Sequence, residues 1–188
     1  MVKKVLAAAT LVSALSISVL AMRTGAESGI KVGEYVSAFH PHHISGPHKG
    51  TDACPPCTYG ALPAVQVWVN GDDIANVEKV AKLLNDRVGD WNKSKFKAFF
   101  IFVTDGAKKA DTTKMIETVV GKVNAKIPMA WIDKTDGAIK DYKVNTDGAV
   151  KNTIFVYKDK QVQTKFVNFE ATKDGLAKLT TAIDSVNK

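Results

Sequence analysis

The chain has 188 residues, of which 45% are hydrophobic and 24% are charged, and its formal net charge is +7. This length is expected to give one domain with a sizeable core. The basic residues are interleaved with Asp and Glu along the whole chain, which indicates a solvated surface, so no nucleic-acid partner is predicted.

The first 26 residues are predicted to be a signal peptide. A basic start, Lys3-Lys4, precedes an uncharged apolar run from Val5 to Ala21, and small residues lead on to Ala26. The run is short for a bilayer span and rich in Ser and Ala, which favours cleavage over the alternative of an uncleaved anchor. Its removal lowers the net charge from +7 to +4, because it contains three basic residues and no acid. We expect an exported protein, periplasmic or extracellular, without a stable membrane span.

The remaining residues predict alternating strands and helices. Runs of β-branched and aromatic residues between turn residues indicate strands, and apolar residues three and four apart indicate amphipathic helices. The alternation favours parallel strands, and a late hairpin adds antiparallel ones. The predicted fold class is therefore α/β, a three-layer α/β/α sandwich with a mixed central sheet over residues 63–188, preceded by an N-terminal arm over residues 27–62. Strands are expected at 63–69, 97–103, 128–133, 152–157 and 161–167, and helices at 73–88, 111–124, 137–142 and 172–186.

The two cysteines of the chain, Cys54 and Cys57, stand in a Cys-Pro-Pro-Cys motif at the end of the arm. The loop before them is too rich in Gly, Pro and His for regular structure to be expected. A pair at this spacing can exchange disulfides, form a structural bridge or hold half of a metal site. The same loop contains all four histidines of the chain, His40, His42, His43 and His48.

These three uses of the cysteine pair stay open at the level of sequence. In thiol–disulfide exchange with protein thiols or disulfides, Cys54 would attack and Cys57 would resolve, with His43 or His48 stabilising the thiolate. A structural disulfide would give local rigidity, because its ring is small. A site for zinc or copper would use His43, His48, Cys54 and Cys57, with His40 and His42 as alternates, and without such a metal no cofactor is predicted.

Several other activities find no support in the sequence. Covalent haem attachment needs a histidine directly after the second cysteine, and Thr58 stands there. There are no paired carboxylates, no nucleophile elbow and no phosphate-binding glycine loop, so neither a hydrolase nor a nucleotide-binding protein is predicted.

The order of elements resembles the thioredoxin-like fold over roughly residues 60–187. Three further segments resemble a group of exported bacterial proteins with this fold: a leader running from Val32-Gly33-Glu34 to Phe39, the turn Gly46-Pro47-His48-Lys49-Gly50, and a CxxC-x-Tyr-Gly motif made by Cys54, Cys57, Tyr59 and Gly60. The resemblance implies a protein of the thioredoxin and redoxin superfamily with a CxxC before the first core strand, and a thiol–disulfide oxidoreductase as its activity.

Two features of thioredoxins are missing from this sequence. Thioredoxins carry the CxxC directly after the first central strand, where a helix begins, and this chain has Asn70-Gly71-Asp72-Asp73 there. They also carry a cis-proline before the hairpin, where this chain has Asn152. The peroxidatic cysteine of peroxiredoxins is absent as well. Residues 58–63 leave room for one turn at most, so no long helix is expected to activate Cys54.

Overall fold

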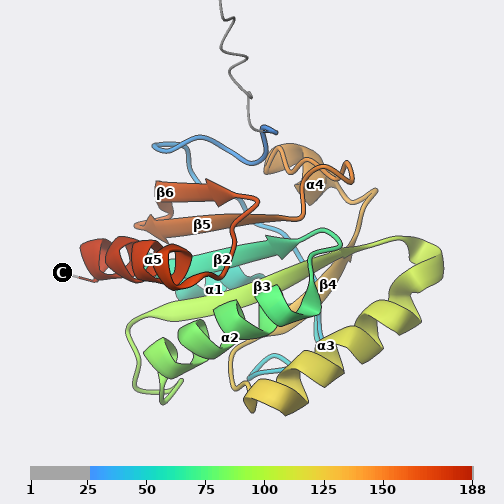
Figure 1. The fold of residues 1–188 in the computed structure, drawn as a ribbon, viewed down its shortest axis with the longest axis horizontal. Helices are drawn as coiled ribbons and strands as arrows, with labels where there is room; N and C mark the ends of the chain where they lie inside the picture. Colours follow the sequence, from blue (N-terminus) through green and yellow to red (C-terminus); the bar gives the residue numbers. More distant parts are fainter. Residues whose placement is uncertain (1–25, 188) are drawn as a thin grey trace, which may run out of the picture.

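The computed structural model describes residues 26–187, and the predicted signal peptide lies outside this range apart from its last residue. Six strands form one mixed sheet in the order β1-β4-β3-β2-β5-β6 (Figure 1). Strands β2, β3 and β4 are parallel, and β1, β5 and β6 each run antiparallel to their neighbour. Within the described residues no helix combines the length and the apolar composition needed to cross a membrane.

The element boundaries follow the sequence patterns closely. Helix starts coincide with side chains that accept a backbone N–H, such as Asp73, Asp136 and Thr172, which is the ordinary way to satisfy the first turn of a helix. The strands are β1 (His42–His43), β2 (Ala64–Val69), β3 (Lys97–Thr104), β4 (Met129–Asp133), β5 (Asn152–Lys158) and β6 (Gln161–Val167), and the helices are α1 (Pro55–Tyr59), α2 (Ile74–Val88), α3 (Lys109–Val123), α4 (Gly137–Asp141) and α5 (Lys173–Val186), with a 3₁₀ turn at Gly106–Lys108.

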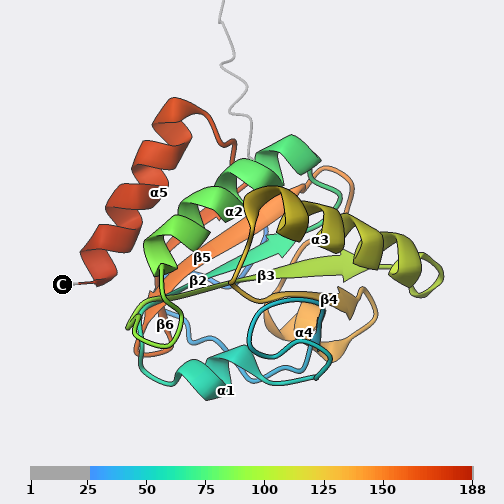
Figure 2. The same ribbon diagram turned by 90° about the horizontal axis from the view of Figure 1, so that it is seen from below.

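One face of the sheet is covered by the three long helices α2, α3 and α5, which lie together on the same side (Figure 2). Alternate residues of each strand point toward them, as the pleat requires. Val65 and Val67 of β2 and Phe100 of β3 are buried there against helix residues such as Leu84 and Ile116. This helix-covered face agrees with the strands and helices that the spacing of apolar residues predicts.

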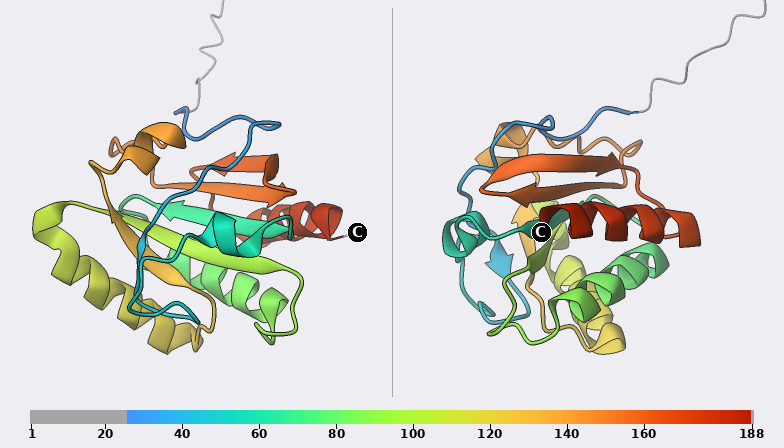
Figure 3. Two further views of the ribbon diagram at one scale, coloured as in Figure 1. Left: turned by 180° about the vertical axis from the view of Figure 1, so that it is seen from behind. Right: turned by 90° about the vertical axis from the view of Figure 1, so that its left-hand side faces the viewer.

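The opposite face is covered mainly by the N-terminal arm, with the short helices α1 and α4 beside it (Figure 3). The arm first runs along the edge of β6, where Gly33 N–H donates to the Val162 carbonyl oxygen (2.8 Å). It then crosses the sheet, and Phe39 stacks on Trp68 with 5.4 Å between ring centroids and meets Tyr142 edge-on at 5.2 Å. The arm is therefore one layer of the sandwich.

The predicted mixed α/β sandwich is confirmed, with two differences in detail. The histidine-rich loop was expected to lack regular structure, but His42 and His43 form strand β1, which pairs antiparallel with Trp131 and Ala130 of β4. The open edge of β4 offers unpaired backbone groups, and this pairing satisfies them. In addition, helix α3 begins two residues earlier than the predicted start at Asp111.

The loop after β1 is fixed to the start of β4. The Ser45 hydroxyl donates to the Ile127 carbonyl oxygen (3.1 Å) and accepts the Met129 N–H (3.0 Å). Gly46 has a φ of +77°, and a Cβ there would lie 2.7 Å from the Pro128 nitrogen, so only glycine fits this approach. The Gly-Pro-x-x-Gly turn thus holds the histidines in place ahead of the cysteine pair.

We expect Phe39→Ala to destabilise the protein by about 3–5 kcal/mol, because Phe39 is 4% exposed and its removal leaves a cavity between the arm and the sheet. Urea unfolding measures the change. Val32→Ala is the matched control, since Val32 belongs to the same arm but is 60% exposed, and it should change stability by less than about 0.5 kcal/mol. Equal effects of the two substitutions would show that the arm is not part of the core.

Candidate functional site

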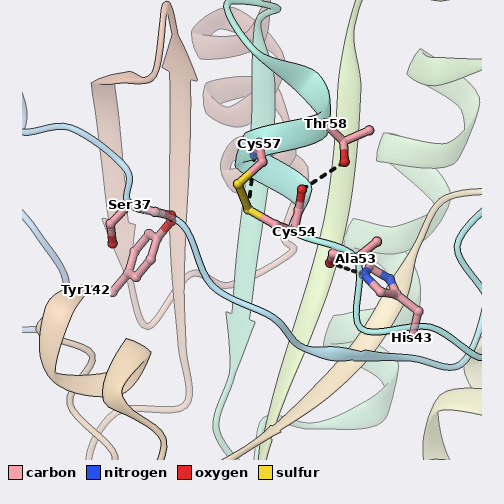
Figure 4. The surroundings of a disulfide bond; sticks show 7 residues. All are labelled: Ser37, His43, Ala53, Cys54, Cys57, Thr58 and Tyr142. Carbon is pink, nitrogen blue, oxygen red and sulfur yellow. Dashed lines mark hydrogen bonds between the residues drawn. A yellow bond between two sulfur atoms is a disulfide. The ribbon is translucent and has the colours of Figure 1, made fainter.

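Cys54 and Cys57 form a disulfide across the first turn of helix α1, with 5.3 Å between their Cα atoms (Figure 4). Cys54 caps the helix, and Pro55 and Pro56 fill its first two positions, where a missing N–H costs little. The first N–H of the helix available for capping is therefore that of Cys57, and it donates to Cys54 Sγ at 3.2 Å. The sequence predicts room for one helical turn only, and this turn is sufficient to direct the N–H of Cys57 at the sulfur of Cys54.

The two sulfur-bearing residues differ in exposure. Cys54 is 7% exposed, whereas Cys57 is on the solvent side of α1 and is exposed. Helix α1 has this orientation because Pro55, Pro56 and Tyr59 are its buried residues. An external thiol therefore reaches Cys57 more readily than Cys54. This argues against the predicted order, in which Cys54 attacks and Cys57 resolves.

Tyr59 anchors α1 to the sheet. Its ring meets Phe99 of β3 edge-on at 5.6 Å and Trp91 at 5.6 Å. The hydroxyl is buried and has no hydrogen-bond partner among residues 26–187. Burial raises the pKa of Tyr59 well above its ordinary value, because a phenolate would lose its hydration there. Tyr59 is thus a neutral, buried hydroxyl directly beneath the disulfide helix.

The histidines take different positions. His43 is 1% exposed, and its Nε2–H donates to the Ala53 carbonyl oxygen (2.9 Å), which leaves Nδ1 without a partner within the described chain. His48 lies beside it with 5.5 Å between ring centroids. His42 interacts with Asp52 through Nδ1 (2.8 Å), and His40 is exposed. The structure therefore brings together His43 and His48 but not all four histidines.

The metal hypothesis requires His43, His48, Cys54 and Cys57 to act as one ligand set. Over residues 26–187 no group of three or more His, Cys, Asp or Glu side chains is arranged to hold an ion. Both sulfurs are also joined to each other, and thiolates rather than disulfide sulfurs are the metal ligands. The residues do not fit a metal in the disulfide state, and the hypothesis for the reduced state stays a prediction.

A polar network fills the place where thioredoxins carry their CxxC. Asp72 accepts the amide N–H groups of Asn76 (2.8 Å) and Asn152 (2.6 Å). Asn152, the first residue of β5, also exchanges two hydrogen bonds with the Phe169 backbone, at 2.7 and 3.0 Å. No cis peptide bond occurs in the described part of the chain. These hydrogen bonds connect the start of α2 with the start of β5 and with the backbone of Phe169.

Comparison with solved structures identifies the fold. A protein from Chlorobium tepidum assigned as the thiol:disulfide interchange protein DsbE superposes with a TM-score of 0.63 at 13% identity, covering 85% of this chain and 99% of its own. A secreted disulfide oxidoreductase of Mycobacterium tuberculosis, homologous to E. coli DsbE, gives 0.53 at 17% identity, with 78% and 95% covered. Yeast Sco1 gives 0.53 at 15% identity, with 80% and 95% covered. The fold is thioredoxin-like, as predicted.

Comparisons at the level of sequence give no family assignment. No protein-family model matches the chain, and no curated protein matches it. Identities of 10–17% to the solved structures are informative about fold and not about activity.

Sequence reasoning missed a second group of side chains next to α1. Lys97, the first residue of β3, is only 8% exposed, and its ammonium donates to the Trp91 carbonyl oxygen (2.7 Å) while lying 4.4 Å from the centre of the Trp91 ring. Burial lowers the pKa of Lys97. The sequence shows a single lysine at the start of an otherwise apolar strand. This pattern is equally compatible with a lysine exposed at the end of the strand, so it does not predict burial.

We expect the protein to become less stable as the pH falls, and we expect His43 to cause part of this loss. Burial holds the pKa of His43 below its ordinary value of 6.5, so the unfolded chain takes up a proton that the native state resists. The free energy of unfolding should therefore decrease as the pH falls through and below about 6.5. His43→Gln should reduce this decrease, and His40→Gln, at an exposed position, should not. An NMR titration giving His43 a pKa at or above 6.5 would contradict the assignment.

Proposed function

We propose that this protein carries out thiol–disulfide exchange through Cys54 and Cys57. The observation that carries the proposal is the asymmetry of the pair: Cys57 is exposed, and Cys54 is buried with its sulfur accepting an N–H. Exchange needs one sulfur that a thiolate can reach and a second that leaves readily. A hydrogen bond to Cys54 Sγ stabilises its thiolate form and so makes Cys54 the better leaving group.

The exchange step begins at Cys57. A substrate thiolate attacks Cys57 Sγ, a new S–S bond joins substrate and Cys57, and the Cys54–Cys57 bond breaks with Cys54 leaving as a thiolate. A second substrate thiolate then attacks the substrate sulfur of the mixed disulfide and releases Cys57 as a thiolate. The two substrate thiols lose two electrons in forming their disulfide, and the protein pair gains them. The reverse sequence reduces a substrate disulfide.

The proposed setting is outside the cytoplasm, periplasmic or extracellular, with protein thiols or disulfides as partners. The basic start and apolar run of residues 1–26 support export. Disulfides persist in such oxidising compartments, so a cysteine pair can cycle there. Two of the structural neighbours are named as a disulfide interchange protein and a secreted disulfide oxidoreductase, which supports the same chemistry for this fold.

The second candidate is a non-enzymatic module in which the Cys54–Cys57 bridge only rigidifies the arm. The packing of Pro55, Pro56 and Tyr59 beneath the bridge favours it, because these contacts tie α1 to the sheet. A zinc or copper site in the reduced state is the other form of this candidate, and it ranks lower because no group of three or more His, Cys, Asp or Glu side chains among residues 26–187 is arranged to hold an ion. The two candidates differ in reduction potential.

We expect the Cys54/Cys57 pair to have a reduction potential of about −120 to −270 mV, the range of exchange proteins. Equilibration of the metal-free protein with glutathione buffers, followed by trapping of free thiols and mass measurement, gives the value. A potential below about −300 mV would mark a structural bridge and contradict the exchange function.

We expect Cys54→Ser to capture a disulfide-bearing partner as a stable mixed disulfide on Cys57: the exposed Cys57 thiolate attacks the partner's disulfide, one partner sulfur leaves as a thiolate, and no second cysteine can release the other. Cys57→Ser, which leaves only the buried Cys54, is the matched control. Its cysteine should react at least about tenfold more slowly. Reaction with an activated aromatic disulfide under identical conditions measures both rates. Faster capture by Cys54 would restore the order predicted from sequence.

A further inference from the structure

A pocket of about 340 Å³ lies where the start of the arm, the segment after α4 and strand β6 meet. These three parts of the chain lie together at one end of the molecule (Figure 1, Figure 3). Hydrogen bonds join them, because Gly29 N–H donates to the Lys143 carbonyl oxygen (2.8 Å) and the Lys165 ammonium donates to the Gly29 carbonyl oxygen (3.1 Å). The lining residues are Glu27, Ser28, Gly29, Lys31, Lys143 and Lys165.

The lining of this pocket is positively charged. Three of its residues are lysines from three separate segments of the chain, and Glu27 is its acidic residue. Three ammonium groups against one carboxylate give the lining a net charge of +2 at neutral pH. Four other pockets of the described chain are lined by a single lysine each. The lysines are spread along the sequence, so it is the fold that brings these three together.

Contacts within the protein hold two of the ammonium groups at the pocket. Lys165 is half-buried, and its bond to Gly29 fixes the end of its side chain. Lys143 pairs with one carboxylate oxygen of Glu34 (2.6 Å), and the other oxygen accepts the backbone N–H of Lys31. These two hydrogen bonds lower the pKa of Glu34, so the ion pair persists at neutral pH. An ammonium that is already ordered loses less side-chain entropy when an anion binds.

The donors of this pocket favour a phosphate group as the ligand. An ammonium has three N–H donors, and among the residues described Lys143 and Lys165 each donate to one acceptor, so further donors are available to a ligand. A phosphate monoester carries a charge of about −1.5 to −2 at pH 7 and three strong acceptor oxygens. Separate lysines act on it as point charges from several directions, whereas a planar carboxylate is matched best by the fork of an arginine.

We propose that this pocket binds the phosphate group of a ligand, with Lys31, Lys143 and Lys165 as the charged contacts. The lining contains no residue of α1 or of the loop before it, so the site is distinct from the cysteine pair. The proposal therefore goes beyond thiol–disulfide exchange and does not depend on it.

Two sources can supply such a phosphate group, a soluble phosphate compound or the headgroup of a lipid. The turn beside the pocket is relevant to this choice, because Val32 and Tyr35 are large apolar side chains that are 60% and 66% exposed. The turn is fixed, since Glu34 N–H donates to the Lys31 carbonyl oxygen (3.0 Å) and Gly33 N–H donates to Val162 of β6. Exposed aromatic and aliphatic side chains beside lysines are also found where proteins contact a membrane surface. The experiment below separates the two sources.

The test is a titration of the isotopically labelled protein with inorganic phosphate at constant ionic strength, followed by NMR. We expect saturable shifts of the backbone N–H signals of Gly29 and Lys165. Lys143→Gln and Lys165→Gln should each raise the apparent Kd by about tenfold, because each removes a charge-assisted contact. Lys31→Gln should raise it by about threefold, because Lys31 is exposed and its contact is weakened by solvent. This exposed substitution keeps the test valid where the other two impair folding.

Lys178→Gln is the matched control, because it removes the same charge from an exposed position on α5, on the helix-covered face of the sheet. It should leave the apparent Kd unchanged. An equal rise of the Kd in Lys165→Gln and Lys178→Gln would show attraction by the net charge alone and would overturn the proposal. The same shifts with sodium chloride in place of phosphate would overturn it too.

Sedimentation with vesicles identifies the source of the phosphate group. Phosphatidylcholine vesicles that contain phosphatidic acid present a phosphate monoester, and vesicles of phosphatidylcholine alone are the control. Binding to the first kind only, lost in Lys165→Gln and weakened in Tyr35→Ala, assigns the site to a lipid headgroup. Saturation by inorganic phosphate without vesicle binding assigns it to a soluble phosphate compound. If phosphate up to about 50 mM gives no saturable shift and the vesicles do not bind, the proposal is wrong.

Discussion

The structure depends on the burial of Phe39 between the aromatic side chains of the sheet's second face. In most sandwiches of this kind both faces of the sheet are covered by helices. Here the three long helices cover one face, and the other is covered by an extended arm whose contact with Trp68 and Tyr142 is largely aromatic. The hydroxyl of Tyr142 also donates to the Ser37 carbonyl oxygen at 2.6 Å, which satisfies the arm's backbone where it crosses. The same face carries helix α1, which follows from the arm and is held to the sheet by Tyr59 against Phe99.

The position of the cysteine pair follows from this arrangement. At the end of β2, where a thioredoxin has its reactive cysteines, Asp72 accepts N–H groups from the side chains of Asn76 and Asn152. The chain instead places two sulfurs on the arm side, on a helix of one turn whose proline residues and Tyr59 face inward. A single turn provides less stabilisation than a long helix, since the dipole of a helix grows with the aligned peptide units. The direct N–H of Cys57 on Cys54 Sγ is therefore the principal local stabilisation that the backbone supplies.

The sequence was sufficient for the sheet and the long helices because their apolar residues repeat with the period of the element they form. Val65 and Val67, for example, alternate with Gln66 and Trp68, and this alternation assigns each side chain to a face. The sequence was insufficient where a residue's environment comes from a distant segment. His43 is buried because β1 pairs with Ala130, and Lys97 is buried because Trp91 folds over it. The exposure of Cys57 likewise depends on how α1 packs, which the spacing of two cysteines does not encode.

The arm has a further consequence for the solution behaviour of the molecule. Its backbone bonds to Val162 near the start of β6, through Gly33 N–H and the Glu34 carbonyl oxygen, and its β1 segment pairs with β4 at the opposite side of the sheet. Exposed edge strands present unpaired backbone groups that recruit strands from other molecules. The arm thus protects backbone groups at both edges of the sheet, at the start of β6 and along β4, from pairing with strands of other molecules. Loss of the arm would therefore expose backbone groups of β4 and of the start of β6 to strands of other molecules at the same time.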